Sequence, residues 1–121
     1  MWVVEYTDEF EIWWNDLTME QQEALHERVA LLSDQGPSLG RPVVEQVDAS
    51  RHPNMKELRV SKAGALRVLF AFDPRRSAIL LLGGDKTGAW DEWYDRFVPE
   101  ADRLYDEHLE VLRQEGLLDF D

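Results

Sequence analysis

Residues 55–86 decide the fold, and they read MKELRVSKAGALRVLFAFDPRRSAILLLGGDK. This stretch holds three short apolar runs, separated by one turn signal around Gly64 and another at residues 73–77. Apolar and β-branched runs bounded by glycine, proline or aspartate are typical of strands joined by short turns. The stretch therefore predicts three consecutive strands, and the uniformly apolar residues 79–82 indicate a central strand covered on both faces.

The first turn decides which side chains share a face, because a slip of one residue exchanges the two faces of a strand. A loop of about three or five residues with Gly64 at positive φ gives consistent faces, whereas a two-residue loop mixes them. The longer loop predicts three cross-strand pairs: Val60 with Leu66, Leu58 with Val68, and Arg59 with Arg67. One face is then apolar, and the other carries Glu57, Arg59 and Arg67.

The residues before this stretch predict a strand followed by a helical hairpin. Residues 2–6 are aromatic and β-branched, as in a strand, and residues 8–16 place apolar side chains at helical spacing. Thr18 and Gln21 have the spacing of a capping box, which predicts a second helix that ends at Gly36. Residues 38–54 indicate a connecting loop, with a short extended piece at residues 43–44.

Residues 99–116 predict a last helix, because Pro99 suits a first helical turn and Gly116 suits the position after a helix. The coarse order is β-α-α-β-β-β-α. We therefore expect an α+β fold: a small antiparallel sheet with an N-terminal helical hairpin and a C-terminal helix, all on one face of the sheet. The length of 121 residues fits one domain, residues 1–121.

Positive charge is concentrated in the middle of an acidic chain. The formal net charge is −12, but residues 51–86 carry eight lysines and arginines against three acidic residues. Proteins that bind nucleic acid through general attraction are usually basic, because affinity scales with the number of phosphates neutralised. We therefore expect no direct binding to DNA, and we expect any anionic substrate to be held at a confined patch and delivered by another macromolecule.

Composition excludes several classes of site. The chain has no cysteine, which rules out disulfides, thiolate nucleophiles and cysteine-ligated zinc. His26, His52 and His108 are too scattered for a local metal-binding motif, and we expect no metal ion or other cofactor. The longest apolar run is too short to cross a bilayer, so we expect a soluble, cytoplasmic protein with no membrane partner.

The basic face offers a candidate site for a phosphodiester. Arg59, Arg67 and Lys86 are reachable from one face, and guanidinium groups grip phosphate oxygens and stabilise charge that develops in a transition state. The competing interpretation is a solvated sheet face on which Glu57 and nearby acidic residues pair with the arginines. Three acidic residues are candidate proton carriers: Glu57, Asp73 and Asp85. His52 is the only histidine in a loop that could reach such a site.

Four motifs follow one another in this chain: KELR at residues 56–59, LRVLF at residues 66–70, ILLL at residues 79–82 with Lys86 and Thr87, and Pro99 before a helix with Ala101 and Arg103. Their succession resembles the HigB-type, phage-derived-protein-like branch of the RelE/ParE superfamily of type II toxins. The typical family pattern is ELR, then YRVL(Y/F), then IVLL-x-x-F-x-KK-T, and then P-x-x-E-(I/L)-x-x-A. The resemblance implies the RelE-like fold.

The resemblance also implies a toxin that cleaves mRNA on the ribosome as an endoribonuclease, without a metal ion, and so inhibits translation. In such enzymes the ribose 2′-hydroxyl is activated against the adjacent phosphate. Matched by position, Arg59 and Arg67 would act on the phosphate, and Lys86 would be a supporting cation or proton carrier. Three further basic residues would follow the RNA backbone: Lys56, Arg75 and Arg76.

The implied partner is a cognate antitoxin, in this branch commonly a small helix-turn-helix protein that binds DNA. Trp90 and Trp93 are candidates for contacts with it, because exposed aromatic residues often anchor interfaces.

Three residues depart from the family pattern: Leu66, Gly84 and Asp85 stand where the family has Tyr, Phe and Lys. Together with the net charge, they motivate a second hypothesis, a catalytically weak or inactive toxin fold that serves as antitoxin ligand or co-repressor. Poisoning of gyrase, as on the ParE side of the superfamily, is a third hypothesis.

Overall fold

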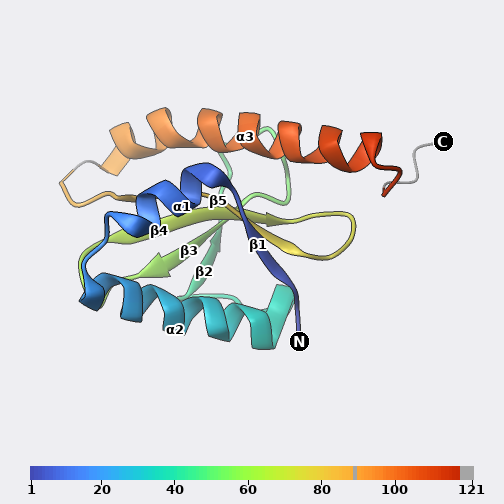
Figure 1. Cartoon of the computed structure of the whole chain (residues 1–121). Helices are drawn as coiled ribbons and strands as arrows, with labels where there is room; N and C mark the ends of the chain where they lie inside the picture. Colours follow the sequence, from blue (N-terminus) through green and yellow to red (C-terminus); the bar gives the residue numbers. More distant parts are fainter. Residues whose placement is uncertain (89, 118–121) are drawn as a thin grey trace.

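Five strands form one sheet in the computed structural model, which describes residues 1–88 and 90–117 (Figure 1). The strands are β1 (Val4–Tyr6), β2 (Val44–Gln46), β3 (Lys56–Val60), β4 (Leu66–Phe72) and β5 (Ala78–Asp85). The helices are α1 (Asp8–Asn15), α2 (Met19–Gln35), the short 3₁₀ helix η1 (Gly36–Ser38) and α3 (Trp90–Gln114). The strand order across the sheet is β1-β5-β4-β3-β2, and the predicted α+β class is confirmed.

Two features of the sheet differ from the sequence-based prediction. β1 lies at one edge and pairs with β5 in parallel, although we expected an antiparallel sheet throughout. The long connection through the helical hairpin allows either direction for an edge strand, so sequence pattern could not decide it. The expected extended piece at residues 43–44 belongs to a fifth strand, β2, which pairs with β3 and is too short to show a period in the sequence.

The predicted helical hairpin forms, and both predicted ends of its second helix are present. The hydroxyl of Thr7 accepts a hydrogen bond from the backbone N–H of Phe10 at 3.0 Å and begins α1. At the start of α2, Thr18 and Gln21 exchange side-chain and backbone hydrogen bonds of 3.1 and 3.0 Å, which is the predicted capping box. Gly36 ends α2 at φ 58°, where the indole of Trp2 leaves no room for a side chain.

The predicted register of the β3–β4 hairpin is confirmed. Residues 61–65 form the loop, and Gly64 has φ 112°. All three predicted cross-strand pairs are present: Val60 with Leu66, Leu58 with Val68, and Arg59 with Arg67. In the turn between β4 and β5, the side chain of Asp73 accepts a hydrogen bond from the backbone N–H of Ser77 at 3.1 Å. Local turn chemistry therefore determines the geometry of both turns.

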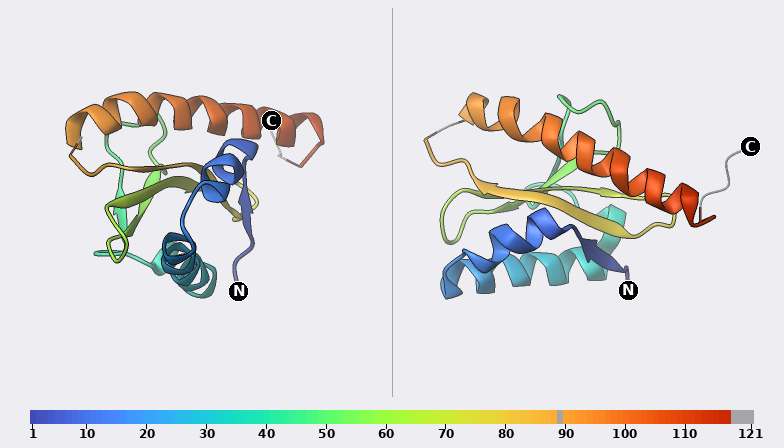
Figure 2. Two further views of the ribbon diagram at one scale, coloured as in Figure 1. Left: turned by 60° about the vertical axis from the view of Figure 1, so that its left-hand side comes forward. Right: turned by 45° about the horizontal axis from the view of Figure 1, so that its top comes forward.

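Helices cover both faces of the sheet, not one face as the sequence pattern predicted (Figure 2). α1 and α2 pack on one face, through a core that includes Phe10, Leu25 and Leu32. α3 packs on the opposite face, through a core that includes Ala101 and Leu104. β5 supplies both cores: Ala78 and Leu80 point to the hairpin, and Ile79 and Leu81 point to α3. The uniformly apolar β5, predicted to be covered on both sides, requires this arrangement.

α3 begins at Trp90, well before the start predicted at Pro99, which lies inside the helix. A proline in a helix interior removes one backbone hydrogen bond. Val98 and Ala101 on either side of it are buried against the sheet, and this burial outweighs the loss. The earlier start carries Trp93 and Tyr94 onto the sheet. Among the described residues, no helix has the length and apolar character that a membrane span requires.

Candidate functional site

The sheet face beneath α3 carries the predicted basic residues. Arg59 on β3 lies directly opposite Arg67 on β4, and Arg67 pairs with Gly84 on its other side. Lys86 follows β5 directly, and its backbone N–H donates to the carbonyl of Ala65 at 3.0 Å. Three neighbouring strands thus bring Arg59, Arg67 and Lys86 to one end of the sheet.

A carboxylate and a phenol lie among these cations. Glu57 is buried, and its carboxylate accepts hydrogen bonds from the hydroxyl of Tyr94 at 2.6 Å and from Nε of Arg59 at 3.1 Å. Nζ of Lys86 donates to the same hydroxyl at 3.0 Å and lies 4.9 Å from the centre of the Tyr94 ring. The hydroxyl of Tyr94 therefore connects a buried ammonium group to a buried carboxylate.

Burial and neighbouring charges shift two pKa values in this cluster. Burial lowers the pKa of Lys86 below its ordinary value, and the charges of Arg67 and Arg59 lower it further, against the attraction of Glu57. Burial raises the pKa of Tyr94 to about 12, and its hydrogen bond to Glu57 contributes in the same direction. Lys86 is thus a stronger acid than an ordinary lysine, and Tyr94 keeps its proton at neutral pH.

Two N–H donors next to this cluster are buried without a hydrogen-bond partner among the described residues: Nε of Arg67 and Nε1 of Trp93. Arg67 does donate to the carbonyl of Leu66 through its terminal nitrogen, at 2.8 Å. Both unpaired donors belong to residues next to Gly84, which pairs with Arg67 and lies against the Trp93 indole. Buried unpaired donors are rare and costly, so this place suits a negatively charged ligand.

The three cations differ in their access to solvent. The Arg59 side chain is 32% exposed, whereas Arg67 and Lys86 are 6% and 2% exposed. Arg59 opens into a pocket of about 370 Å³ that Glu57 and Tyr94 also line. Ligands can therefore reach Arg59 directly, while the first turns of α3 cover the other two cations.

The structure does not bring the predicted RNA-backbone residues to this cluster. Lys56 lies on the face of β3 opposite to Glu57, because neighbouring residues of a strand alternate. Arg75 and Arg76 lie in the β4–β5 turn, at the other end of these strands. Arg75 pairs there with Asp73 at 2.8 Å, and Arg76 lies 4.8 Å from the ring centre of Trp2. Contact between these residues and RNA stays a prediction.

The structure describes only one of the two tryptophan side chains that were predicted to contact the antitoxin. Trp93 is buried, contrary to the expected exposed ring, because it packs over Gly84 and stacks on Phe97 with ring centres 4.8 Å apart. The side chain of Trp90 lies outside the described part of the chain.

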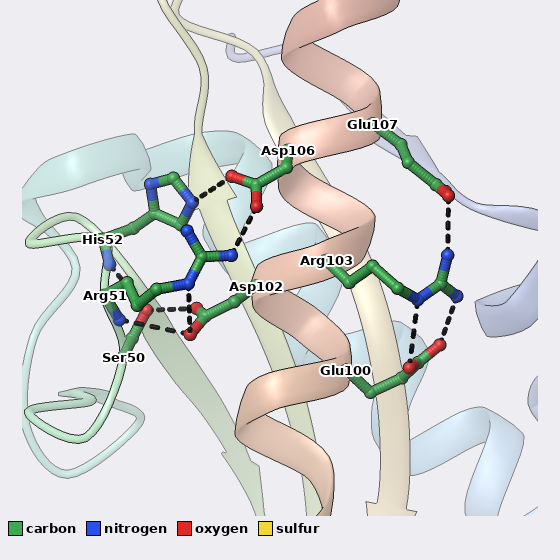
Figure 3. A network of polar contacts seen from close by, with 8 residues as sticks. All are labelled: Ser50, Arg51, His52, Glu100, Asp102, Arg103, Asp106 and Glu107. Atoms are coloured by element: carbon green, nitrogen blue, oxygen red, sulfur yellow. Dashed lines mark hydrogen bonds and ion pairs between the residues drawn. The ribbon is translucent and has the colours of Figure 1, made fainter.

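His52 belongs to a second polar cluster, between residues 50–52 and α3 (Figure 3). Its Nε2 lies 2.8 Å from a carboxylate oxygen of Asp106, which also pairs with Arg51. The neighbouring Asp102 is buried and accepts hydrogen bonds from the Ser50 hydroxyl at 2.5 Å and from the backbone N–H of Arg51 at 3.1 Å. This cluster ties the loop before β3 to the helix that carries Tyr94.

Sequence reasoning did not single out Tyr94. An aromatic residue in such a stretch usually belongs to a core or an interface, so its residue type alone does not indicate a catalytic role. The partner of Tyr94, Glu57, was considered as a proton carrier on the basic face, but the two residues are 37 positions apart. Only the packing of α3 on β3 reveals the contact.

Comparison with known proteins places the chain in a family. Residues 12–106 match the family described as "Phage derived protein Gp49-like (DUF891)". HigB2, a candidate toxin of Mycobacterium tuberculosis (strain ATCC 25618 / H37Rv), is 46% identical over 99 residues, which are 80% of this chain and 49% of HigB2. HigB3, a candidate toxin of the same strain, is 50% identical over 93 residues, which are 77% of this chain and 81% of HigB3. This chain therefore spans about half the length of HigB2.

A solved structure shows the same fold. The crystal structure of the intact E. coli RelBE toxin–antitoxin complex contains a chain with a TM-score of 0.57 and 8% sequence identity. The match covers 70% of this chain and 96% of that one. At this identity the likeness concerns the fold alone, and it confirms the expected RelE-like architecture. The family match and the two HigB relatives confirm the resemblance of the motifs: the chain belongs to the phage-derived, Gp49-like family, the HigB-type branch of the RelE/ParE superfamily.

Proposed function

We propose that this chain is the toxin of a type II toxin–antitoxin system, an endoribonuclease that cleaves mRNA on the ribosome without a metal ion. The description of HigB2 and HigB3 as candidate toxins supports the first part. The observation that carries the second part is the convergence of Arg59, Arg67 and Lys86 around the hydrogen-bonded pair of Glu57 and Tyr94. The toxin domain would comprise residues 1–121.

In the proposed reaction, the ribose 2′-oxygen forms a bond to the adjacent phosphorus, and the bond from phosphorus to the 5′-oxygen breaks. The products are a 2′,3′-cyclic phosphate and a free 5′-hydroxyl. Arg59 and Arg67 neutralise the charge that develops on the phosphate oxygens, because guanidinium groups match the geometry of these oxygens. The unpaired Nε of Arg67 would gain its missing acceptor in this way.

Two proton transfers accompany this exchange of bonds. Tyr94 takes the proton of the 2′-hydroxyl while it passes its own proton to Glu57, whose carboxylate lies 2.6 Å away. Lys86 gives a proton to the departing 5′-oxygen, and its lowered pKa makes this transfer easier than from an ordinary lysine. The cluster thus supplies one base, one acid and two guanidinium groups.

Access to the site supports delivery of the message by the ribosome. The net charge of −12 does not attract free RNA over a distance. Arg67 is buried in the free chain, and its cross-strand neighbour Gly84 lies against the Trp93 indole, so a phosphate can contact Arg67 only after side chains around it move. Arg59 is exposed enough to make the first contact.

The proposed partner is a cognate antitoxin, a small helix-turn-helix protein that would make the contacts with DNA. The structural relative from E. coli was solved as a toxin–antitoxin complex, which supports such a partner. The antitoxin would cover the basic face or its rim. Trp90 and Trp93 stay predicted contacts, and Trp93 could take part only after its ring leaves the sheet.

Cleavage of ribosome-bound mRNA by the purified protein, with the new 5′ ends mapped, tests the proposal. We expect Arg59→Ala to lower the cleavage rate by about 10²-fold or more, because it removes a charge next to the reacting phosphate. Arg113→Ala removes an exposed arginine near the end of α3 and should leave the rate unchanged. The proposal fails if the wild type cleaves no ribosome-bound message, or if both variants cleave equally well.

The burial of Arg67 and Lys86 favours a second candidate function, a non-catalytic binding module. In this case the fold would serve as antitoxin ligand or co-repressor, and the cluster would only stabilise the contact of α3 with the sheet. Ribosome-dependent cleavage by the purified chain would exclude this candidate.

A further inference from the structure

Arg67 and Trp93 each carry a buried N–H donor, and the proposed reaction uses only that of Arg67. The two side chains are 6% and 4% exposed. Nε of Arg67 and Nε1 of Trp93 have no hydrogen-bond partner among the described residues. A buried indole N–H usually donates to a neighbouring group, and buried donors without an acceptor are rare. Two such donors at one place indicate an acceptor from outside the chain.

The two donors are neighbours on the sheet. Arg67 on β4 pairs with Gly84 on β5, and the side chains of paired residues lie on the same face. A Cβ atom at Gly84 would lie 2.6 Å from Nε1 of Trp93, so this nitrogen occupies the place of the missing side chain. The indole N–H is therefore the cross-strand neighbour of the Arg67 side chain.

The charge of Arg67 also lacks a counter-ion. Arg67 forms no ion pair within the part of the chain that the structure describes. The acidic residues near it have other partners, because Glu57 accepts a hydrogen bond from Tyr94 and Asp85 accepts two from Thr87. Burial of a guanidinium group without a counter-ion destabilises a fold. An anion that enters from outside would neutralise this charge and accept from both donors.

The indole of Trp93 is held in one orientation. Its ring stacks on Phe97 with ring centres 4.8 Å apart, meets the ring of Tyr94 edge to face at 5.1 Å, and lies against Gly84. A donor that is fixed before the substrate arrives stabilises developing charge without reorganisation of the site. The N–H of Trp93 is thus suited to an oxygen that becomes more negative during a reaction.

We infer that Trp93 is a substrate-binding residue, and that its indole N–H and Nε–H of Arg67 together bind one phosphate group. Both hydrogen bonds end on non-bridging oxygens of this group, and Trp93 exchanges no proton. The identification of the group as the phosphate of the cleaved RNA bond rests on the proposed function. Binding of phosphate itself requires no cleavage, so it can be tested separately.

Inorganic phosphate, added to the full chain labelled with ¹⁵N, tests the site by nuclear magnetic resonance. The chain has five tryptophans, and Trp93→Phe identifies the indole N–H signal of Trp93 by its absence. We expect phosphate to shift this signal saturably and sodium chloride of equal ionic strength to leave it in place. Arg67→Met removes the second donor and should abolish the shift, while the other four indole signals report whether this variant folds. A Trp93 signal that phosphate does not move overturns the inference.

Cleavage kinetics on ribosome-bound mRNA separate phosphate binding from packing. Trp93→Phe keeps an aromatic ring at this position and removes the N–H donor. We expect kcat to fall by about 10²-fold with a smaller change in KM, because the hydrogen bond strengthens in the transition state. Trp14→Phe is the matched control, since Trp14 packs in the core on the opposite face of the sheet, and it should leave kcat unchanged. A kcat of Trp93→Phe equal to that of the wild type would show that the indole only packs, and would overturn the inference.

Failure of the inference and failure of the proposed function give different results. A wild-type protein in which phosphate shifts the Trp93 signal, but which cleaves no ribosome-bound mRNA, contradicts the proposed function and leaves the phosphate site intact. A wild-type protein that cleaves the message while phosphate leaves the Trp93 signal in place overturns the inference alone.

Discussion

The indole of Trp93 fills the space beside Gly84: a Cβ atom at position 84 would lie 2.6 Å from Nε1 of Trp93. Gly84 also pairs with Arg67 across the β4–β5 ladder, so the indole packs on the strand position next to the arginine. A side chain at position 84 would therefore meet the indole directly.

Gly84→Ala should therefore displace the indole of Trp93 and loosen the neighbouring Tyr94, whose hydroxyl accepts a hydrogen bond from Lys86, so that Lys86 becomes more exposed. We expect the free energy of unfolding to fall by about 1–3 kcal/mol, because the added methyl group overpacks a close contact. Lys86 should react faster with an amine-directed reagent, as measured by mass spectrometry of the labelled protein. Gly40→Ala is the matched control, since no atom lies within 4 Å of a Cβ there. Unchanged protection of Lys86 in Gly84→Ala would refute this interpretation of the contact.

Tyr94→Phe removes the hydroxyl that joins Lys86 to Glu57 and keeps the ring. If Tyr94 carries the proton from the 2′-hydroxyl, the cleavage rate should fall by about 10²–10⁴-fold, the usual contribution of a general base. The free energy of unfolding should fall by only about 1–2 kcal/mol, because the carboxylate keeps its bond from Arg59. Tyr6→Phe changes an exposed tyrosine and should leave cleavage unaffected. A Tyr94→Phe variant with the wild-type rate would remove Tyr94 from the mechanism.

The strands of the site could be predicted because alternation and turn chemistry agree there. The apolar side chains of residues 56–60 and 66–70 share one face of the sheet only when the loop between the two strands is longer than two residues. Gly64 provides the positive φ that this loop requires. This agreement is sufficient to pair Arg59 with Arg67 from the amino-acid pattern alone. Local signals thus determine the part of the site that lies on adjacent strands.

The rest of the site depends on contacts that no local pattern encodes. α3 starts at Trp90, and Pro99 suggested a later start because proline favours first turns. A register shift in the β4–β5 ladder, where Leu69 pairs with Leu82 but Phe70 pairs with Leu80, decides how the end of β5 meets the helices. Such a bulge has no signature in this sequence. The cover over the cations could therefore be found only in the structure.

Acid should destabilise the contact between the β4–β5 turn and α3. Burial alone would raise the pKa of Asp73, but hydrogen bonds from His108, Arg75 and the backbone of Ser77 hold it below its ordinary value. A lowered pKa stabilises the fold above the unfolded pKa of about 3.9, and this stabilisation is lost as the pH falls through the folded value.

We expect Asp73→Asn to lower the free energy of unfolding at pH 7 by about 1–3 kcal/mol, because it weakens the hydrogen bonds of a buried carboxylate. Below about pH 4, the stability of the variant should also decline less than that of the wild type, since the variant has no carboxylate to protonate at this position. Urea denaturation at several pH values measures both effects. Asp34→Asn, at an exposed position on α2, is the control. An identical pH dependence in Asp73→Asn and the wild type would contradict the assignment.

The cluster around Asp102 should stabilise the contact of α3 with the sheet much more than the exposed ion pairs of the same helix (Figure 3). Asp102 is buried and accepts hydrogen bonds from the Ser50 hydroxyl and the Arg51 backbone, so Asp102→Ala would leave both donors without their acceptor. We expect it to lower the free energy of unfolding by about 2–4 kcal/mol. Glu107→Ala breaks an exposed pair with Arg103 and should leave the urea midpoint nearly unchanged, because solvent screens such pairs. Equal midpoints for the two variants would show that the loop before β3 does not hold α3. The position of Tyr94 would then depend on the apolar contacts of the helix and on the hydrogen bonds of Tyr94 with Glu57 and Lys86.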